Sequence, residues 1–235
     1  MTIAPNRLIM PHPLTLVGND GSLERRLIAQ LGPDTVFMMG DNPAYAAMPQ
    51  KPTLLDFFRY RFGAIVRNHL ALSAFHALEA GHSESVVMAC LLHDIAMGAL
   101  IHAEHGYWSA QLVRPYVSAE IAWAIEKHQA LRFLPDPEVG YDYPEIYHRF
   151  FGREYVPPPH IQKEAEAARH HAWYMTSRII TLNDVYSFES TEAPQLELFE
   201  DIIGRNFRQP EEGLGFDDSP VAHMWRTMIW PENFL

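Results

Sequence analysis

Cysteine is nearly absent from this chain, since Cys90 is the only one among 235 residues. One cysteine cannot form a disulfide within the chain or build a cluster of thiolate metal ligands. Small disulfide-stabilised secreted folds and cysteine-based zinc modules are therefore excluded. The composition suits a reducing compartment, so we expect a cytoplasmic protein.

Basic residues are also scarce. Lys and Arg number 18 against 29 Asp and Glu, which gives a formal net charge of −11 at pH 7. Nucleic acids and anionic membrane surfaces are bound by a basic face, so we expect neither as a partner. A small anion remains compatible with this charge, because a local pocket is enough to bind it.

Long apolar runs are missing as well. No stretch reaches the roughly 20 residues of a membrane-spanning helix, and residues 1–10 lack the apolar core of a secretion signal. We therefore expect a protein that is neither exported nor inserted in a membrane. At 48% hydrophobic residues the chain can bury a large core, and we expect one domain over residues 1–235.

Helical patterns begin at Thr53, after a proline-rich start in which we expect mostly irregular structure and one short helix over residues 23–31. A capping-box-like sequence at Thr53 opens a helical pattern that continues to Ala80 and stops at Gly81. A cap at Ser83 or Ser85 begins the next helix, which runs to residue 92. Two antiparallel helices joined at Gly81 would bring residues 69 and 93 side by side.

A second helix pair follows, over residues 105–117 and 119–131, with a cap at Ser118. Residues 140–159 are rich in prolines and aromatics and predict a long loop. Further helices are predicted over residues 161–188 and 195–206, and a last turn of helix from Ser219. No strand pattern competes, so the expected fold is all-α, with an irregular N-terminal and a helical C-terminal extension.

The dipeptide His93-Asp94 closes an apolar run and is the strongest functional signal. The alternative to a metal site is an incidental polar pair at a helix end. Partners at suitable spacing favour the metal site: His69, His105, His128 and Asp184. An aspartate at a helix C-terminus opposes the helix dipole, and a bound cation would remove that penalty.

Other histidines are weaker candidates. His102 competes with His105 for one ligand position, and we prefer His105 because it opens a helix. The neighbours His170 and His171 face different ways on a helix and predict surface or core roles. We expect surface or core roles as well for the histidines without supporting geometry: His12, His76, His82, His148, His160 and His223.

The ordered series of His69, His93-Asp94, His105, His128 and Asp184 resembles the HD-domain superfamily of all-helical metalloproteins. The resemblance covers roughly residues 57–188, within a core of about residues 54–190 flanked by extensions at 1–53 and 191–235. It implies an HD-domain helical bundle with two metal ions. By resemblance, His69, His93, Asp94 and Asp184 hold one ion, His105 and His128 hold the other, and Asp94 bridges them.

Within the superfamily, the run from His128 to Leu134 is similar to the di-iron oxygenases that cleave hydroxylated phosphonates. In that branch a basic residue four positions after the corresponding histidine contacts the anionic substrate, and Arg132 occupies that place here. A guanidinium suits bidentate capture of a phosphonate or carboxylate. Arg178, two helical turns before Asp184, is a second candidate for binding the anion.

The chain also departs from that branch. A glutamate expected shortly before the first histidine is missing near Tyr60, Thr181 stands where an arginine is expected, and Ile95-Ala96 follow Asp94 in place of Gly-Lys. These departures leave the substrate open.

The same ligands serve two mechanisms. As an oxygenase, the protein would use iron and O₂ to oxidise its substrate and break a C–C or C–P bond, and an imidazole and carboxylate set suits non-haem iron. As a phosphohydrolase, it would use Mn, Co, Mg or Zn to activate water against a phosphoester. A third hypothesis is an inactive scaffold that binds a partner. We favour the oxygenase, because all six ligands and Arg132 are present.

Overall fold

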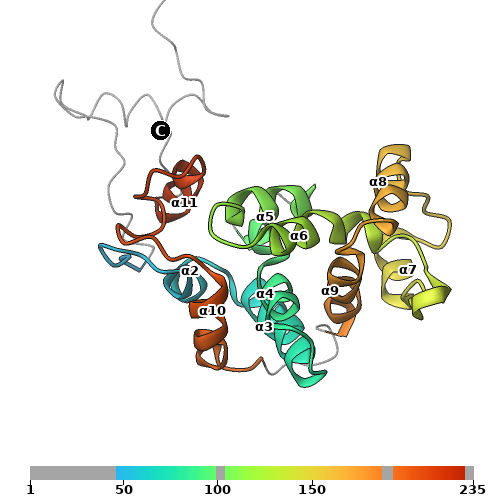
Figure 1. Ribbon diagram of the computed structural model, residues 1–235, viewed down its shortest axis with the longest axis horizontal. Coiled ribbons are helices and arrows are strands. Elements are labelled where there is room, and N and C mark those ends of the chain that lie inside the picture. The colour runs from blue at the N-terminus through green and yellow to red at the C-terminus, as the bar shows by residue number, and fades with distance from the viewer. Residues whose placement is uncertain (1–45, 99–103, 187–192, 231–235) are drawn as a thin grey trace, which may run out of the picture. The chain divides into compact units, whose positions relative to one another are not determined.

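The computed structural model describes residues 46–98, 104–186 and 193–230, all within one compact unit that spans Gly40–Leu235. Helices account for the regular structure of these residues, where an isolated bridge between Asp136 and Tyr141 is the only strand-like pairing (Figure 1). The expected all-α fold is confirmed. In chain order the α-helices are α2 (Leu54–Tyr60), α3 (Ala64–Glu79), α4 (Glu84–Leu92), α5 (His105–Val113), α6 (Ala119–Leu131), α7 (Glu145–Phe151), α8 (Pro159–Arg169), α9 (Tyr174–Tyr186), α10 (Glu200–Asn206) and α11 (Ala222–Ile229).

The first predicted long helix is broken in two. Thr53 forms the expected capping box with Asp56, but α2 ends at Tyr60 and α3 begins only after Gly63. Glycine is a poor helix former, and the break turns Phe62 into the core, where only 4% of it is exposed. The prediction of an uninterrupted helix was wrong at this point.

Helices α3 and α4 form the predicted antiparallel pair. Gly81 makes the turn with φ of +74°, a left-handed conformation that suits glycine, and the Ser83 hydroxyl accepts from Val86 N to cap α4. All residues of α4 from Val86 to Leu92 are buried. The pair therefore carries residue 93 into the centre of the bundle.

Helices α5 and α6 form the second pair, and Ser118 caps α6 as predicted. The predicted end of the first helix at residue 117 was too late, since α5 ends at Val113. Gly106 makes the close packing possible: a Cβ there would lie 3.1 Å from the carbonyl oxygens of both Ile125 and Glu126. Any larger residue would push α5 away from α6.

The region after α6 differs most from expectation. The predicted loop over residues 140–159 contains α7, and the predicted helix over residues 161–188 is interrupted between α8 and α9. The interruption lets the His171 ring stack on Trp123 of α6, with ring centroids 4.0 Å apart. Helix α9 then packs against α3, α4 and α6, which places residue 184 at their shared interface.

The C-terminal extension is helical, as expected, and packs within the chain. A short 3₁₀ helix (Leu196–Phe199) leads into α10, which packs on α4. In α11, Trp225 is fully buried, packs edge-on against Phe57 and donates its indole N–H to Leu112 O over 3.1 Å. The apolar segment at residues 224–230 is thereby part of the core.

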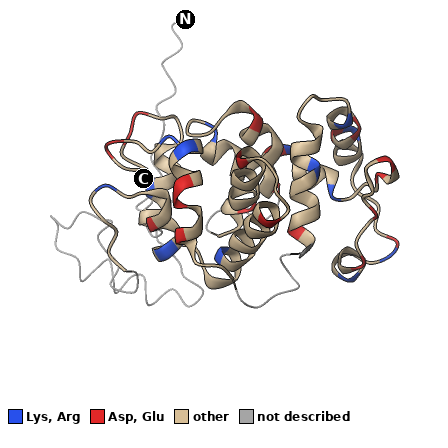
Figure 2. Cartoon of the chain, turned by 60° about the horizontal axis from the view of Figure 1, so that its bottom comes forward, with Lys and Arg blue, Asp and Glu red and all other residues tan. Residues whose placement is uncertain are grey.

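Charged residues of both signs are spread over several helices (Figure 2). Among the residues that the structure describes, none of the helices has the length and apolar character needed to cross a bilayer. The helix predicted over residues 23–31, and the irregular start around it, lie outside the described residues.

Candidate metal centre

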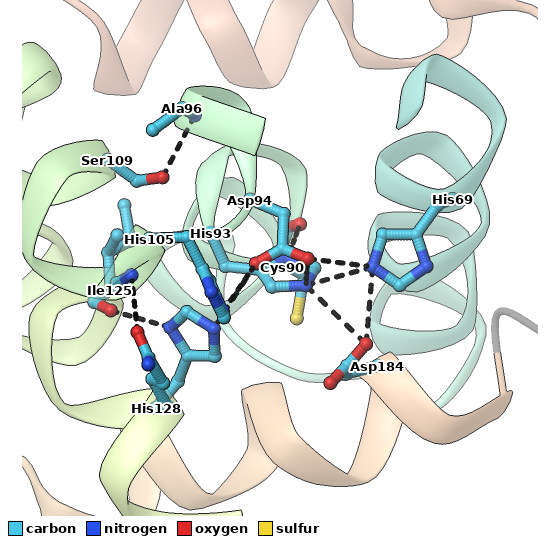
Figure 3. Close-up of polar contacts among 12 residues, drawn as sticks. His69, Cys90, His93, Asp94, Ala96, His105, Ser109, Ile125, His128 and Asp184 are labelled. Atoms are coloured by element: carbon cyan, nitrogen blue, oxygen red, sulfur yellow. Dashed lines mark hydrogen bonds and ion pairs between the residues drawn. The ribbon is translucent and has the colours of Figure 1, made fainter. Parts of the chain in front are cut away.

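Two groups of ligand-type side chains meet in the middle of the bundle (Figure 3). The first group contains His69, His93, Asp94 and Asp184, and the second contains Asp94, His105 and His128. Within each group the candidate ligand atoms lie within 4.8 Å of one another. Asp94 belongs to both groups, so the six side chains form one continuous site that could hold metal ions.

Five elements bring these residues together. His69 comes from α3, the pair His93-Asp94 follows α4, and Asp184 comes from α9. On the other side of Asp94, His105 begins α5 and His128 lies in the last turn of α6. The site therefore forms only when both helix pairs and α9 have packed.

Asp94 faces the two groups with different oxygens. Its Oδ2 lies 3.5 Å from His69 Nε2 and 3.7 Å from His93 Nε2. Its Oδ1 lies 3.2 Å from His105 Nε2 and 3.3 Å from His128 Nε2. This arrangement suits a carboxylate that bridges two cations.

The first group closes around Asp184. Its Oδ1 lies 3.2 Å from His69 Nε2 and 3.7 Å from His93 Nε2, and those two nitrogens are 3.1 Å apart. Atoms bound about 2.1 Å from one ion lie about 3.0 to 3.4 Å apart along the edges of an octahedron or tetrahedron. The observed spacings are close to that range.

Backbone carbonyls fix the direction of two imidazoles. His93 Nδ1 donates to Cys90 O over 2.7 Å, and His128 Nδ1 donates to Ile125 O over 2.6 Å. A carbonyl can only accept, so the proton of each neutral ring sits on Nδ1 and the lone pair on Nε2 faces the site. This outer contact is the usual support of a metal-binding histidine.

His128 and Asp94 face each other as two acceptors. Burial lowers the pKa of His128, so the ring is neutral near pH 7. Its Nε2 and Asp94 Oδ1 are both buried, and neither makes a well-formed hydrogen bond within the described part of the chain. Two lone pairs 3.3 Å apart repel unless a cation lies between them, so the donor set fits a metal ion.

The carboxylates are held in their charged form. Burial opposes ionisation of Asp94 and Asp184, but the surrounding histidines outweigh it and keep both pKa values well below the usual range. Burial also opposes a charge on His69, yet hydrogen bonds to Asp184 and Asp94 raise its pKa to about 10. One proton on His69 thus partly balances two buried negative charges in the metal-free protein.

Local contacts and backbone conformation set the positions of Asp94 and His105. Ser109 Oγ accepts from Ala96 N over 3.0 Å, which ties the turn after Asp94 to α5. Glu104, just before His105, has a left-handed backbone with φ of 54°, a sparsely populated conformation for a residue with a side chain. Gln129 accepts from Gly106 N over 3.0 Å and joins α5 to α6 beside the second group.

Arg132 lies one helical turn after His128, as predicted, at the C-terminal end of α6. Its guanidinium carbon is 5.0 to 5.7 Å from the ring centroids of Phe133, Tyr147 and Phe151. No carboxylate of the described residues lies within ion-pair distance, and its buried Nε has no hydrogen-bond partner there. The side chain is a partly buried cation available for an anion.

Arg178 is placed differently. It is only 3% exposed, donates to Leu131 O over 2.8 Å and to the Tyr174 hydroxyl over 3.0 Å, and stacks over Tyr141. These contacts tie α9 to the end of α6. Its Nη2 keeps no hydrogen bond within the described ranges, so one donor remains for a ligand.

Tyr147 was missed by the sequence analysis. It lies in α7, inside the segment predicted as loop, and its hydroxyl donates to Asp184 Oδ2 over 2.6 Å. Burial raises the pKa of Tyr147 well above its usual value, so the hydroxyl keeps its proton. The four-residue spacing of Tyr143, Tyr147 and Phe151 is a helical aromatic pattern that could have revealed it.

The remaining histidines stand apart from the two ligand groups. His171 is exposed and stacks on Trp123, while His160 and His223 lie at the surface. His76, His82 and His148 are partly buried outside both groups, and His170 is exposed. His12 and His102 lie outside the described residues, so the choice between His102 and His105 stays a prediction, although the structure does place His105 in the second group.

The two groups differ in what they offer an ion. The first supplies four ligand atoms and the second supplies three, with one oxygen of Asp94 in each. An ion that prefers six ligands would keep two open positions in the first group and three in the second. The second group therefore has more room for an exchangeable ligand such as water or substrate.

Comparison with protein-family models and with curated proteins gave no match for this chain.

Proposed function

We propose that this protein is a dinuclear metalloenzyme of the HD-domain type, an oxygenase that uses two iron ions and O₂ to cleave a small anionic hydroxylated substrate. The observation that carries the proposal is the position of Asp94, whose two oxygens face two separate ligand groups. The order of the ligands along the chain supports the HD-domain assignment.

The ligand types support iron. The two groups combine four imidazoles with two carboxylates, and the only cysteine, Cys90, is buried with its thiol pKa raised to about 12 by burial. Imidazole and carboxylate together suit non-haem iron, whereas Mg²⁺ prefers oxygen ligands alone. Bound iron would supply the redox chemistry that O₂ activation requires.

Arg132 supports an anionic substrate. Its charge lies one helical turn from His128 and beside Tyr147, which contacts Asp184. An arginine lacking a carboxylate partner can form two parallel hydrogen bonds to a phosphonate or carboxylate. It would hold the substrate's charged end while the adjacent hydroxylated carbon faces the second ligand group.

Other residues of the site keep the candidate ligands and Arg132 in place. His93 and His128 keep their Nε2 atoms aimed at the centre through hydrogen bonds to Cys90 and Ile125 carbonyls. The aromatic rings around Arg132 exclude water from one side of its guanidinium, which strengthens its attraction for an anion. In this way the proposed site would combine a rigid ligand frame with the charge of Arg132, and Arg178 Nη2 would offer a second donor.

The test is O₂ consumption by the iron-loaded protein with a panel of small α-hydroxylated phosphonates and carboxylates. At least one compound should give O₂ uptake matched by product, with inorganic phosphate released from a phosphonate. The variant Asp94→Asn should abolish uptake. The same panel should include phosphomonoesters and nucleotides with Mn²⁺, Co²⁺ or Zn²⁺. Hydrolysis without O₂ uptake would replace the oxygenase with a phosphohydrolase, and no turnover of any compound would favour a scaffold.

A further inference from the structure

Tyr147 of α7 contacts the candidate metal centre directly. Among the residues of α7, all of which the structure describes, Tyr147 alone is buried, whereas Glu145, Arg149 and Phe150 are exposed. Phe151 is half-buried and packs on Phe133, with ring centroids 5.2 Å apart. The attachment of α7 therefore combines this ring packing with the contacts of the buried Tyr147.

The Tyr147 hydroxyl forms a hydrogen bond with a candidate metal ligand. It donates to Asp184 Oδ2 over 2.6 Å, while Asp184 Oδ1 faces His69 and His93 at 3.2 and 3.7 Å. The two oxygens of Asp184 therefore have separate partners. The phenol holds Oδ2, and Oδ1 is directed at the histidines of the first ligand group.

The ring of Tyr147 contacts a second functional residue. Its centroid lies 5.7 Å from the guanidinium carbon of Arg132, and the ring packs near Tyr143 and Phe151. The phenol thus spans from the proposed substrate-binding arginine to a proposed metal ligand. A residue that served packing alone would not need a hydroxyl at this place.

From this geometry we propose that Tyr147 is a positioning residue that holds Asp184 as a single-oxygen ligand of the first metal ion. The inference rests on the two-metal centre of the proposed function. Hydrogen bonds to a metal-binding carboxylate orient it before the ion arrives, and loss of such outer contacts typically weakens metal affinity about 10- to 100-fold. Without the hydroxyl, Asp184 Oδ2 loses this hydrogen bond, and the carboxylate is held less firmly in its single-oxygen orientation.

The experiment compares Tyr147→Phe with the wild-type protein and with Tyr143→Phe as a matched control. Tyr143 precedes α7 and its ring centroid lies 5.8 Å from that of Tyr147, but it forms no hydrogen bond or ion pair with any of the six candidate ligands. Each metal-free protein is titrated with Co²⁺ against a competing chelator, and the visible absorption spectrum is recorded after each equivalent. Circular dichroism and thermal unfolding of the metal-free proteins show whether each variant folds.

The expected result is specific to one ion. Tyr147→Phe should weaken the tighter of the two Co²⁺ equivalents about 10- to 100-fold and change its spectrum, while the other equivalent and the Tyr143→Phe protein stay within about twofold of wild type. A folded Tyr147→Phe protein with wild-type affinities and spectra would overturn this inference and leave the two-metal centre intact. A wild-type protein that binds no Co²⁺ would overturn both.

Discussion

Asp94 Oδ1 and His128 Nε2 face each other over 3.3 Å as two buried hydrogen-bond acceptors. The imidazole cannot resolve the conflict by turning its proton toward the carboxylate, because Nδ1 donates to Ile125 O. Such a pair is unfavourable in a folded core unless a positive charge joins it. This relationship is the strongest physical argument that the second ligand group holds a cation.

Removing one ligand from each group in turn should show that the two ions bind to different groups. His69→Ala should abolish tight binding in the first group, and His128→Ala in the second, so that each variant retains about one equivalent, while Asp94→Asn should weaken both because it removes a shared ligand. Metal content after gel filtration against a weak chelator measures this. Loss of both ions in His128→Ala, with wild-type secondary structure, would argue against two separable groups.

Metal uptake by the first group should depend on pH. His69 has a pKa of about 10 in the metal-free protein, so below that pH a metal ion must displace its proton. Affinity should therefore rise roughly tenfold per pH unit between about pH 7 and 9, with close to one proton released per first ion. The pKa of His128 is lowered, so that ring should release none near pH 7.

Calorimetric titration in two buffers of different ionisation enthalpy counts these protons. His69→Ala provides the control. In this variant only the second ligand group should still bind an ion tightly, and the proton released by His69 should be missing from the titration. A pH-independent affinity of the wild-type protein for both ions would contradict the assigned role of His69.

Metal should stabilise the fold. The six ligands come from elements that meet only in the folded protein, so an ion at about 100 times its dissociation constant should add about 2.7 kcal/mol to the free energy of unfolding. Thermal unfolding with and without a chelator measures the effect. An unchanged midpoint at saturating metal would show that the ions bind outside the bundle.

Gly106→Ala should loosen the second group. A Cβ at this position would lie 3.1 Å from two carbonyl oxygens of α6, so the backbone there must shift by a few tenths of an ångström, at an expected cost of about 1 to 3 kcal/mol. His105 is the neighbouring residue and should move with α5. Urea unfolding measures the cost, and Gly204→Ala serves as a control because no atom lies within 4 Å of its added Cβ. Equal stability of the two variants would contradict the packing argument.

Arg132 and Arg178 should respond differently to substitution. Arg132→Met should leave metal content unchanged and raise the KM for an anionic substrate about 10- to 100-fold, the equivalent of one or two charge-assisted hydrogen bonds. Arg178→Met should mainly destabilise the fold, because it removes the bonds to Leu131 O and the Tyr174 hydroxyl. Steady-state kinetics and thermal unfolding of both variants separate the roles. Unchanged kinetics in Arg132→Met would remove the main argument for an anionic substrate.

The sequence predicted the helix pairs well because their signals are local. Ser83, Ser118 and Gly81 mark helix ends through their own backbone and hydroxyl chemistry, and the structure places each at an end. The residues of both candidate ligand groups were also named from the sequence, and the structure brings them together. Their convergence followed from the turn positions.

The errors lie where tertiary contacts override local pattern. The break at Gly63 depends on burying Phe62, and the break before α9 depends on the stacking of His171 on Trp123. Helix α7 was missed because prolines flank it and its aromatic residues resemble a loop, and its buried residue, Tyr147, is held by the candidate ligand Asp184 of α9. The partners of His171 and Tyr147 are 48 and 37 residues away in sequence.

The most direct test of the central claim is the metal content of protein purified without added metal, measured together with Asp94→Asn. A di-iron oxygenase should contain about two iron ions per wild-type chain, with a mixed-valence spectroscopic signal, and the variant should lose most of them. Two ions of Mn, Co, Mg or Zn would keep the dinuclear centre and reject the oxygenase. Wild-type protein that binds no metal, even after titration with Fe²⁺, would contradict the proposed metal centre.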